Sequence, residues 1–158
     1  MKNTETISYL PAEKGSYLLL MKLSEVQSLQ IPHLKDYVFT EGYYIYIGSA
    51  LGPGGIRARV GRHIRKEKKI HWHIDHLTTV ADLYSTVLIL SPSRLETLLT
   101  GFLMKTDLTP VPGFGCGDSE DYSHLFYSGK KKNFDLAVGS LTNYLQSTFP
   151  TQIWRFDV

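Results

Sequence analysis

The alternation of hydrophobic and polar positions predicts a set of short β-strands. Residues 15–23 are apolar and lie between turn residues, which is typical of a buried strand. Residues 37–39 and 43–48 predict two further strands, and the turn-like segment 40–42 between them indicates a hairpin. Residues 83–90 predict another strand. We therefore expect a small sheet that is mainly antiparallel.

Helical periodicity is found between these strands. A helix that begins near Gly55 places Ile56, Val60 and Ile64 on one face, at positions i, i+4 and i+8. The other faces of this helix carry arginines. Residues 72–80 predict a second, shorter helix.

Two more helices are expected in the second half of the chain. Pro92 predicts the start of a helix that reaches about Lys105, because proline is preorganised for a first helical turn. The segment 107–123 is rich in proline and glycine and predicts an ordered loop. Asn133 can cap a final helix, whose apolar stripe consists of Phe134, Val138, Leu141 and Leu145. Together the elements predict an α+β fold in which helices flank the sheet.

Length and composition fit a single domain that spans residues 1–158. The sequence contains no run of about 18 apolar residues, so we expect no membrane span. Its first residues lack the apolar region of a secretory signal, and Cys116 is the only cysteine. Intramolecular disulfides are therefore excluded, and a cytoplasmic location is expected.

Basic residues are concentrated in one segment of a chain whose net charge is only +2. Within residues 56–70 a single acid, Glu67, accompanies seven basic residues, which are Arg57, Arg59, Arg62, Arg65, Lys66, Lys68 and Lys69. Such a cluster produces a local field much stronger than the net charge implies. From charge alone, a site for a polyanion and an ordinary solvated helix face are equally good interpretations.

Two short motifs and the basic helix between 55 and 64 resemble the GIY-YIG nuclease superfamily. The motifs are GSY at residues 15–17 and YIG at residues 46–48, and they are followed by Arg59 and His63, four residues apart. More narrowly, the chain is similar to the branch called domain of unknown function one hundred and twenty-three over about residues 14–128, with residues 129–158 as a C-terminal helix and tail. The segments that carry this narrower resemblance are 15–17, 42–52, 62–63, 72–75, 113–115 and 123–127.

The resemblance implies a small central three-stranded antiparallel sheet with an added hairpin strand, flanked by helices. It also implies a metal-dependent DNA endonuclease that hydrolyses phosphodiester bonds with Mg²⁺ or Mn²⁺, with a role in DNA repair. DNA is the expected partner, and a repair protein is expected to supply target recognition. The alternative of a catalytically inactive nucleic-acid-binding module of the same fold stays open, as does a domain that binds an acidic protein partner.

By this resemblance Tyr17 and Tyr46 form the pair that activates water or orients the phosphate. Phosphodiester cleavage requires a deprotonated water and stabilisation of charge on the phosphoryl oxygens. A tyrosine assists only if its pKa is lowered or its hydroxyl joins a hydrogen-bonded relay. Arg59 is the expected phosphate clamp, since arginine stays charged and grips two oxygens at once. His63 is expected to donate to a phosphate or to shuttle a proton near neutral pH, although a border position on its helix explains it equally well.

The resemblance places a histidine beside the phosphate and a glutamate at the metal. His71 or His73 is the candidate histidine, and Glu96 is the candidate metal ligand. Two alternatives to Glu96 remain open at this point. Ser93 and Glu96 also match a capping box, and another alignment puts Thr100 at the metal position.

Further expectations concern the surface around this site. The loop 49–55 and the helix after it could attract an anion, or could simply be a turn. Trp72 is expected to pack, with base stacking as the alternative. Asp118 and His124 are expected to hold a glycine-rich loop. The residues expected to follow a nucleic-acid backbone are Arg62, Arg65, Lys66, Lys68 and Lys69.

Overall fold

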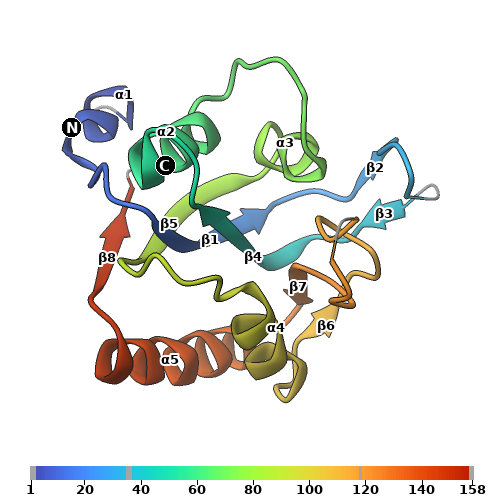
Figure 1. Cartoon of the computed structure of the whole chain (residues 1–158). Helices are drawn as coiled ribbons and strands as arrows, with labels where there is room; N and C mark the ends of the chain where they lie inside the picture. Colours follow the sequence, from blue (N-terminus) through green and yellow to red (C-terminus); the bar gives the residue numbers. More distant parts are fainter. Residues whose placement is uncertain (1–2, 35–36, 118, 157–158) are drawn as a thin grey trace.

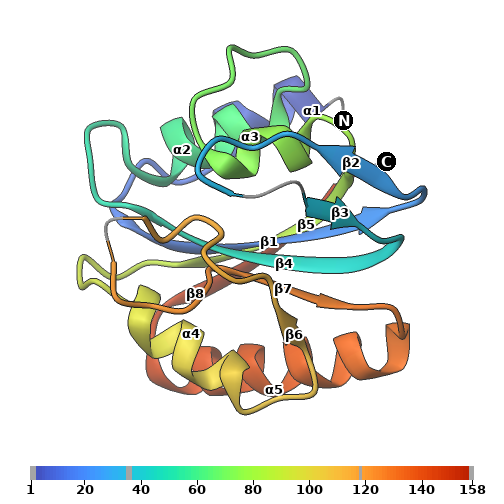
Figure 2. The ribbon, with the colours of Figure 1, turned by 90° about the vertical axis from the view of Figure 1, so that its right-hand side faces the viewer.

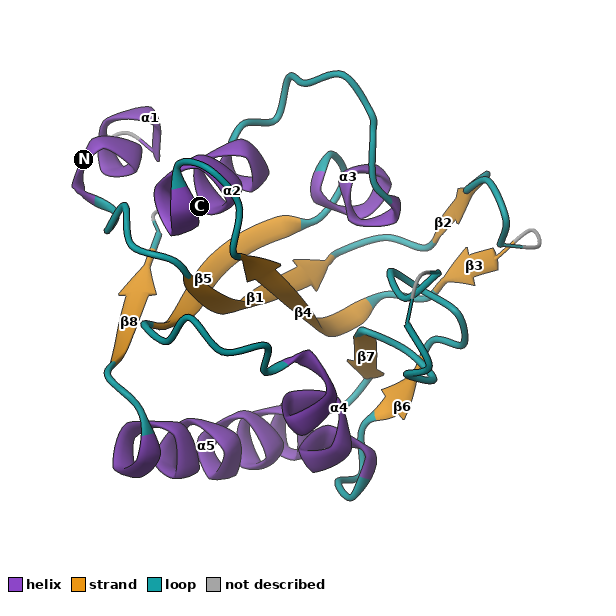
Figure 3. Ribbon diagram, viewed as in Figure 1, coloured by secondary structure: helices purple, strands orange, loops and turns teal. Residues whose placement is uncertain are grey.

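The computed structural model describes residues 3–34, 37–117 and 119–156. Their main feature is an antiparallel sheet of six strands in the order β6-β7-β4-β1-β5-β8 (Figure 3). These strands are β1 (Gly15–Leu23), β4 (Gly42–Ala50), β5 (Asp82–Ile89), β6 (Thr109–Pro110), β7 (Leu125–Ser128) and β8 (Thr151–Arg155). A separate two-stranded sheet consists of β2 (Gln27–Leu29) and β3 (Tyr37–Phe39).

Helices cover both faces of the large sheet (Figures 1 and 2). The first face carries α1 (Asn3–Thr6), the 3-10 turn η1 (Ile7–Tyr9), α2 (Gly55–Ile64) and α3 (His73–Thr78). The opposite face carries α4 (Glu96–Met104) and α5 (Lys131–Thr148). Within the described residues, no helix combines the length and the apolar character that crossing a membrane requires.

The core has two layers because successive side chains of a strand point to opposite faces of the sheet. Along β1, Tyr17 and Leu19 pack in the cluster beneath α2 and α3, whereas Leu18 and Leu20 pack in the cluster above α4 and α5. The first cluster includes the predicted stripe of α2, which is Ile56, Val60 and Ile64. The second includes the buried stripe of α5, which is Phe134, Ala137, Leu141 and Leu145.

The predicted α+β class is confirmed, but the predicted size of the sheet and its hairpin are wrong. Strands β7 and β6 extend the sheet beyond β4, and β8 extends it beyond β5. Strand β3 pairs with β2 instead of β4, so residues 37–39 and 43–48 do not form a hairpin. The physical reason is that β4 has no free edge, because β1 and β7 already pair with its two sides.

Several element boundaries also differ from the prediction. Helix α4 begins at Glu96 and not near Pro92, and α5 begins at Lys131, so Asn133 lies inside the helix and does not cap it. The segment predicted as loop contains the short strand β6. The expected C-terminal helix is α5, which packs on the sheet, and the segment after it forms the edge strand β8, which pairs with β5.

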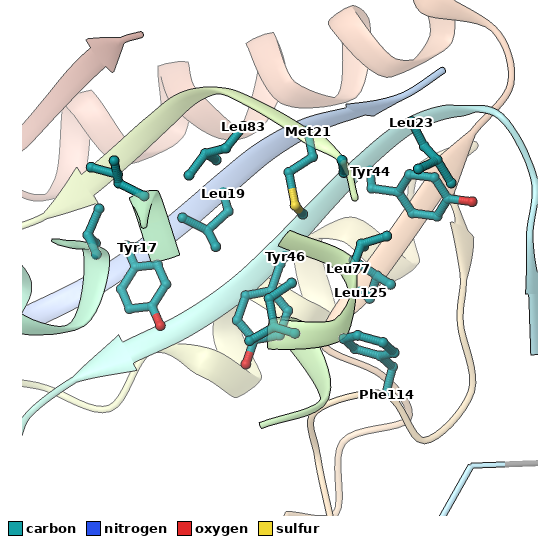
Figure 4. Close-up of a cluster of buried hydrophobic side chains, with 14 of the residues drawn as sticks. Tyr17, Leu19, Met21, Leu23, Tyr44, Tyr46, Leu77, Leu83, Phe114 and Leu125 are labelled. Atoms are coloured by element: carbon teal, nitrogen blue, oxygen red, sulfur yellow. The ribbon is translucent and has the colours of Figure 1, made fainter. Parts of the chain in front are cut away.

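The register of β1 and β4 brings two tyrosines to the same face of the sheet. Tyr17 lies opposite Gly48, and Leu19 lies opposite Tyr46. Tyr17 and Tyr46 are therefore diagonal neighbours, and their hydroxyls point to the same side (Figure 4). The ring of Tyr17 covers Gly48 so closely that a Cβ on this glycine would clash with it. Gly48 is thus needed for close approach of the ring.

We predict that Gly48→Ala forces the Tyr17 ring out of its place and lowers the free energy of unfolding by about 1–3 kcal/mol, as overpacking of a core does. Gly139→Ala is the matched control, because a Cβ at this position in α5 meets nothing within 4 Å. This control should be stabilised by about 0.5–1 kcal/mol, since alanine favours a helix interior. Denaturant unfolding measures both, and a Gly48→Ala protein as stable as the wild type would contradict the packing described.

Candidate functional site

Five of the predicted site residues lie around one pocket. Tyr17, Tyr46, Arg59, His63 and Glu96 all line a pocket of about 330 Å³. The two tyrosines come from β1 and β4, Arg59 and His63 come from α2, and Glu96 is the first residue of α4. Helices from opposite sides of the sheet therefore contribute to the same pocket, although these residues are far apart in the sequence.

His63 forms the closest contact in the pocket. Its Nε2 lies 2.7 Å from Oη of Tyr17, and both side chains are buried. Burial, assisted by the positive charge of Lys68, lowers the pKa of His63 to about 3. The imidazole is therefore neutral near pH 7 when the pocket holds no ligand. Its position makes it a hydrogen-bonding partner of Tyr17.

Both phenols are held in the protonated form. Burial, and next the neighbouring Tyr46, raise the pKa of Tyr17 well above its ordinary value, against the opposing effect of Arg59. Burial and the charge of Glu96 raise the pKa of Tyr46. Near neutral pH the two hydroxyls thus act as hydrogen-bonding groups and not as phenolates.

Arg59 lies at the centre of the positive side of the pocket. Its guanidinium carbon stacks over the ring of Trp72, 4.3 Å from the ring centroid, and the side chain is half-buried. Arg59 lowers the pKa of Tyr17, because its positive charge lies near that hydroxyl. An arginine held in this way by an aromatic face is well placed to grip an anion beside the tyrosines.

Glu96 faces the pocket from the opposite wall. Its Oε2 lies 3.6 Å from Nδ1 of His124. The capping-box alternative is wrong, because Leu95 is the N-cap of α4 and makes no side-chain capping bond. Thr100, the alternative metal position, is buried one turn further along the helix and does not line the pocket. Of the two candidates, the structure brings only Glu96 to the site.

Sequence reasoning missed part of this opposite wall. Arg94, Thr97, Ser119 and Asp121 also line the pocket. Arg94 and Thr97 flank Glu96 in the sequence, so a search around the expected metal ligand would have found them. Ser119 and Asp121 come from the loop after β6, whose folding toward the sheet has no local sequence signal.

His124 holds this loop in place, as predicted. Its Nδ1 lies 3.0 Å from the carbonyl oxygen of Gly115, and its Nε2 lies 2.9 Å from the carboxylate of Asp121. Burial alone would raise the pKa of Asp121. The hydrogen bonds from His124, Ser119 and Thr97 have the larger effect, so the net pKa lies below its ordinary value and the carboxylate is charged at neutral pH. Asp118, the other predicted loop contact, lies outside the described residues.

His71 and His73 are not among the pocket-lining residues. His71 is exposed, and its ring meets the edge of Trp72 with centroids 4.9 Å apart. Nδ1 of His73 accepts a hydrogen bond of 3.0 Å from the amide of Gly115. The structure therefore gives both histidines a packing role around the site and not a place beside a substrate.

A buried carboxylate organises the segment that follows α2. Asp75 is fully buried, and its Oδ2 accepts hydrogen bonds from the amides of His71 (2.8 Å) and Trp72 (3.0 Å). The same oxygen lies 2.5 Å from a guanidinium nitrogen of Arg62. Burial raises the pKa of Asp75, but these amides and Arg62 together lower it below its ordinary value. Arg62, predicted to follow a nucleic-acid backbone, is instead paired inside the protein.

Two of the predicted DNA-binding lysines also bind backbone carbonyls. Nζ of Lys66 donates to the carbonyls of Thr78 (2.9 Å) and Ala81 at the end of α3. Nζ of Lys68 lies 3.1 Å from the carbonyls of Arg62 and His63 at the end of α2. Burial lowers the pKa of Lys68 to about 8. Lys66 is nevertheless exposed, as are Arg65 and Lys69.

The start of α2 does not provide an anion site. The amides of Gly55, Ile56 and Arg57 already donate to the carbonyls of Gly52 (3.2 Å), Glu13 (2.9 Å) and Pro11 (2.9 Å), respectively. A helix N-terminus attracts anions through amides that have no other partner. The turn interpretation of residues 49–55 is therefore the correct one.

The carboxylates that line the pocket are the groups that could bind a metal there. Within residues 3–34, 37–117 and 119–156, no group of three His, Cys, Asp or Glu side chains could hold a metal. Mg²⁺, however, often binds through one or two carboxylates and completes its shell with waters and substrate phosphates. Glu96 fits this mode of binding.

These features define an α+β protein with a polar pocket. The pocket is lined by two strands of an antiparallel sheet and by helices from both sides of that sheet. The family model described as Domain of unknown function DUF123 matches residues 16–146, and the chain belongs to this family. No curated protein and no solved structure matches the chain.

We predict that His63 makes the protein less stable in acid. Its pKa falls from 6.5 in the unfolded chain to about 3 in the folded protein, so the unfolded chain binds the extra proton between these values. Stability from this group is complete above about pH 6.5 and is lost as the pH falls toward 3. Denaturant unfolding should show a slope of up to about 1.4 kcal/mol per pH unit that His63→Gln lacks.

His71→Gln is the control for this comparison, because the ring is exposed. It should keep the wild-type slope. Equal slopes in wild type and His63→Gln would show that the buried imidazole binds its proton as readily as a free one.

We further predict that two arginines near the end of α2 differ in their effect on stability. Arg62→Ala leaves the buried carboxylate of Asp75 without its cation, which should lower the free energy of unfolding by about 3 kcal/mol. Arg65→Ala removes an exposed side chain and should change it by less than about 0.5 kcal/mol. Denaturant unfolding separates the two, and similar losses would contradict the structural role of Arg62.

Proposed function

We propose that the protein is a divalent-metal-dependent DNA endonuclease with a GIY-YIG-type active site. The observation that carries this proposal is the convergence of Tyr17, Tyr46, Arg59, His63 and Glu96 on one pocket. In this proposal the neighbouring strands β4, β1 and β5 correspond to the three-stranded core of that superfamily. The remaining strands of the sheet are additions to it.

The chain's own groups supply the binding of the phosphate. Arg59 is a fixed cation beside the two phenols and would grip the phosphoryl oxygens of the scissile bond. The protonated hydroxyl of Tyr46 would donate a hydrogen bond to the same group, and the burial of this side chain strengthens the bond. These donors are preorganised, because the sheet and α2 hold them before a substrate arrives.

The hydrogen bond between Tyr17 and His63 offers a path for the proton of the attacking water. As the water loses a proton to Oη of Tyr17, the phenolic proton moves to Nε2 of His63, and the hydroxide attacks phosphorus while the bond between phosphorus and the leaving oxygen breaks. The leaving oxygen takes a proton from a solvent water. His63 then becomes an imidazolium, which its buried site disfavours. The negative charge of the phosphoryl group nearby would offset that cost.

Glu96 is the residue that would hold the metal. When bound, Mg²⁺ or Mn²⁺ supplies Lewis-acid stabilisation of the phosphoryl oxygens and lowers the pKa of a bound water. Glu96 is placed for this role because it faces Arg59 across the pocket. The carboxylate is half-buried and is 3.6 Å from His124.

The surface that meets the rest of the DNA is smaller than the basic segment suggests. Arg65 and Lys69 are exposed beyond α2, and Arg94 is exposed at the pocket. We infer that these residues, and not Arg62, Lys66 or Lys68, contact the flanking phosphates. Because this basic surface is small, we propose that a partner repair protein supplies target recognition. A cytoplasmic location stays a prediction.

A nucleic-acid-binding module without activity is the second candidate. The raised pKa values of Tyr17 and Tyr46 favour this candidate. Near neutral pH both side chains are protonated phenols, and neither is a phenolate that could deprotonate a water. In this case DNA would bind without being cut, and binding would weaken steeply between about 50 and 200 mM salt as counterions are released.

We predict that nicking of supercoiled plasmid in the presence of Mg²⁺ falls at least about 100-fold in Tyr17→Phe, Arg59→Ala and Glu96→Gln. Each change removes one donor, cation or carboxylate from the pocket, and the loss of one such group typically costs two to three orders of magnitude. The initial rate of nicking is the measurement.

Two matched controls accompany these variants. Tyr43→Phe changes a tyrosine of the same strand as Tyr46 that points to the other face of the sheet. Glu120→Gln changes an exposed acid in the loop that carries Asp121. Both controls should nick at the wild-type rate. Equal nicking by all variants would mean a contaminating nuclease, and binding without nicking by the wild type would establish the inactive module.

A further inference from the structure

A second hollow lies on the other side of Arg59. It has a volume of about 170 Å³, and its walls include Gly52, Pro53 and Ala58 from the start of α2 and the loop before it. Arg59 and Trp72 line both this hollow and the catalytic pocket. A chain that leaves the catalytic pocket past Arg59 would therefore enter the hollow directly.

Three side chains with planar groups, Arg59, Trp72 and Arg62, lie against one another along one wall of the hollow and are called the column below. The guanidinium carbons of Arg59 and Arg62 lie 4.3 Å and 4.8 Å from the ring centroid of Trp72. The fully buried Asp75 fixes the column in place, because its carboxylate accepts hydrogen bonds from the guanidinium of Arg62 and from the amide of Trp72. Planar side chains of this kind are the surfaces on which proteins stack unpaired bases.

The remaining walls suit an uncharged ring better than a phosphate. The charge of Arg62 is already paired with Asp75. The amides of Gly55 and Ile56 at the start of α2 already donate to carbonyls, so they cannot bind an anion. Pro53 and Ala58 add apolar surface. At about 170 Å³ the hollow is smaller than the 300–1,000 Å³ of drug-sized sites, so it admits only one small ring system.

We propose that this hollow binds the nucleobase of the nucleotide next to the scissile phosphate, stacked on the column of Arg59, Trp72 and Arg62. The proposal rests on the proposed nuclease function for the place of the phosphate. A base in a Watson–Crick pair is stacked between its neighbours and cannot enter so small a hollow. The substrate class is therefore DNA with an unpaired nucleotide beside the cut, such as a single-stranded end, a gap or a flap.

The test compares strands that carry the same phosphates with and without bases. Trp72 and Trp154 are the only tryptophans, so a Trp154→Phe protein reports on Trp72 alone by fluorescence. Its titration, without divalent metal, uses a short single-stranded oligothymidylate and a fully abasic strand of equal length. Oligothymidylate should quench Trp72 and bind about tenfold more tightly, the usual effect of a stacked base. A blunt duplex of equal length should leave Trp72 unquenched.

A filled hollow provides the matched variant. Ala58 is exposed on α2 and lines the hollow but not the catalytic pocket, so Ala58→Leu, in the Trp154→Phe protein, fills the site and leaves Tyr17 and Glu96 untouched. It should remove the preference for oligothymidylate over the abasic strand. Ser140→Leu, an equally exposed change on α5, should keep it.

The outcomes separate this proposal from the proposed function. Two results would overturn the nucleobase site, even if plasmid nicking is observed. One is equal affinity of the unfilled protein for oligothymidylate and the abasic strand. The other is quenching of Trp72 by the duplex that is as strong as quenching by the single strand. A preference for bases that Ala58→Leu abolishes, in a protein that never nicks DNA, would retain the nucleobase site and reject the nuclease. If Ala58→Leu does not fold, the comparison of the two strands still decides.

Discussion

The hydrogen bond between Tyr17 and His63 is the interaction on which the rest of the site depends. It joins the central sheet to α2 with a distance of 2.7 Å between two buried side chains. In such surroundings a hydrogen bond between neutral groups is strong, and the loss of either partner leaves a buried polar atom unsatisfied. It can form only because Gly48 leaves room for the ring of Tyr17 and because Ile56 holds α2 on the sheet. Strand register, helix packing and the pocket are therefore one structural unit.

A second constraint is the use of positive charge inside the protein. Arg62, Lys66 and Lys68 come from the segment with the highest density of basic residues, yet each binds a carboxylate or backbone carbonyls within the fold. Together they hold the end of α2, the connection to α3 and the end of α3 against one another. A run of cations in a sequence is thus a poor measure of surface potential, because helix ends and buried acids attract the same side chains. The charge left for a ligand is that of Arg59 at the pocket and of a few exposed residues around it.

The sequence predicts the local elements well and their long-range pairing poorly. The strand at 15–23 and the stripe of Ile56, Val60 and Ile64 follow from periodicity, which is a local property. The pairing of β3 with β2, and the strands β6, β7 and β8, depend on which sheet edges are free, and no local pattern records that. Tyr17, Tyr46, Arg59 and His63 were found through motifs, whereas Asp121 lines the same pocket without one. Its position is decided by the contacts of His124 with Gly115 and with Asp121 itself, which only the folded loop contains.

The distribution of charge across the pocket bears on what it holds. The wall formed by α2 carries the cation of Arg59, and the opposite wall carries the carboxylates of Glu96 and Asp121 together with the exposed cation of Arg94. Between them lie two phenols and an imidazole that are neutral near pH 7. A site for a free anion would gain nothing from two acids within the same small space, since they would repel it. A phosphodiester with a bound divalent cation would match this polarity, since Arg59 would hold its oxygens and Glu96 would hold the cation. This match supports a metal-bound phosphodiester over a simple anion as the ligand.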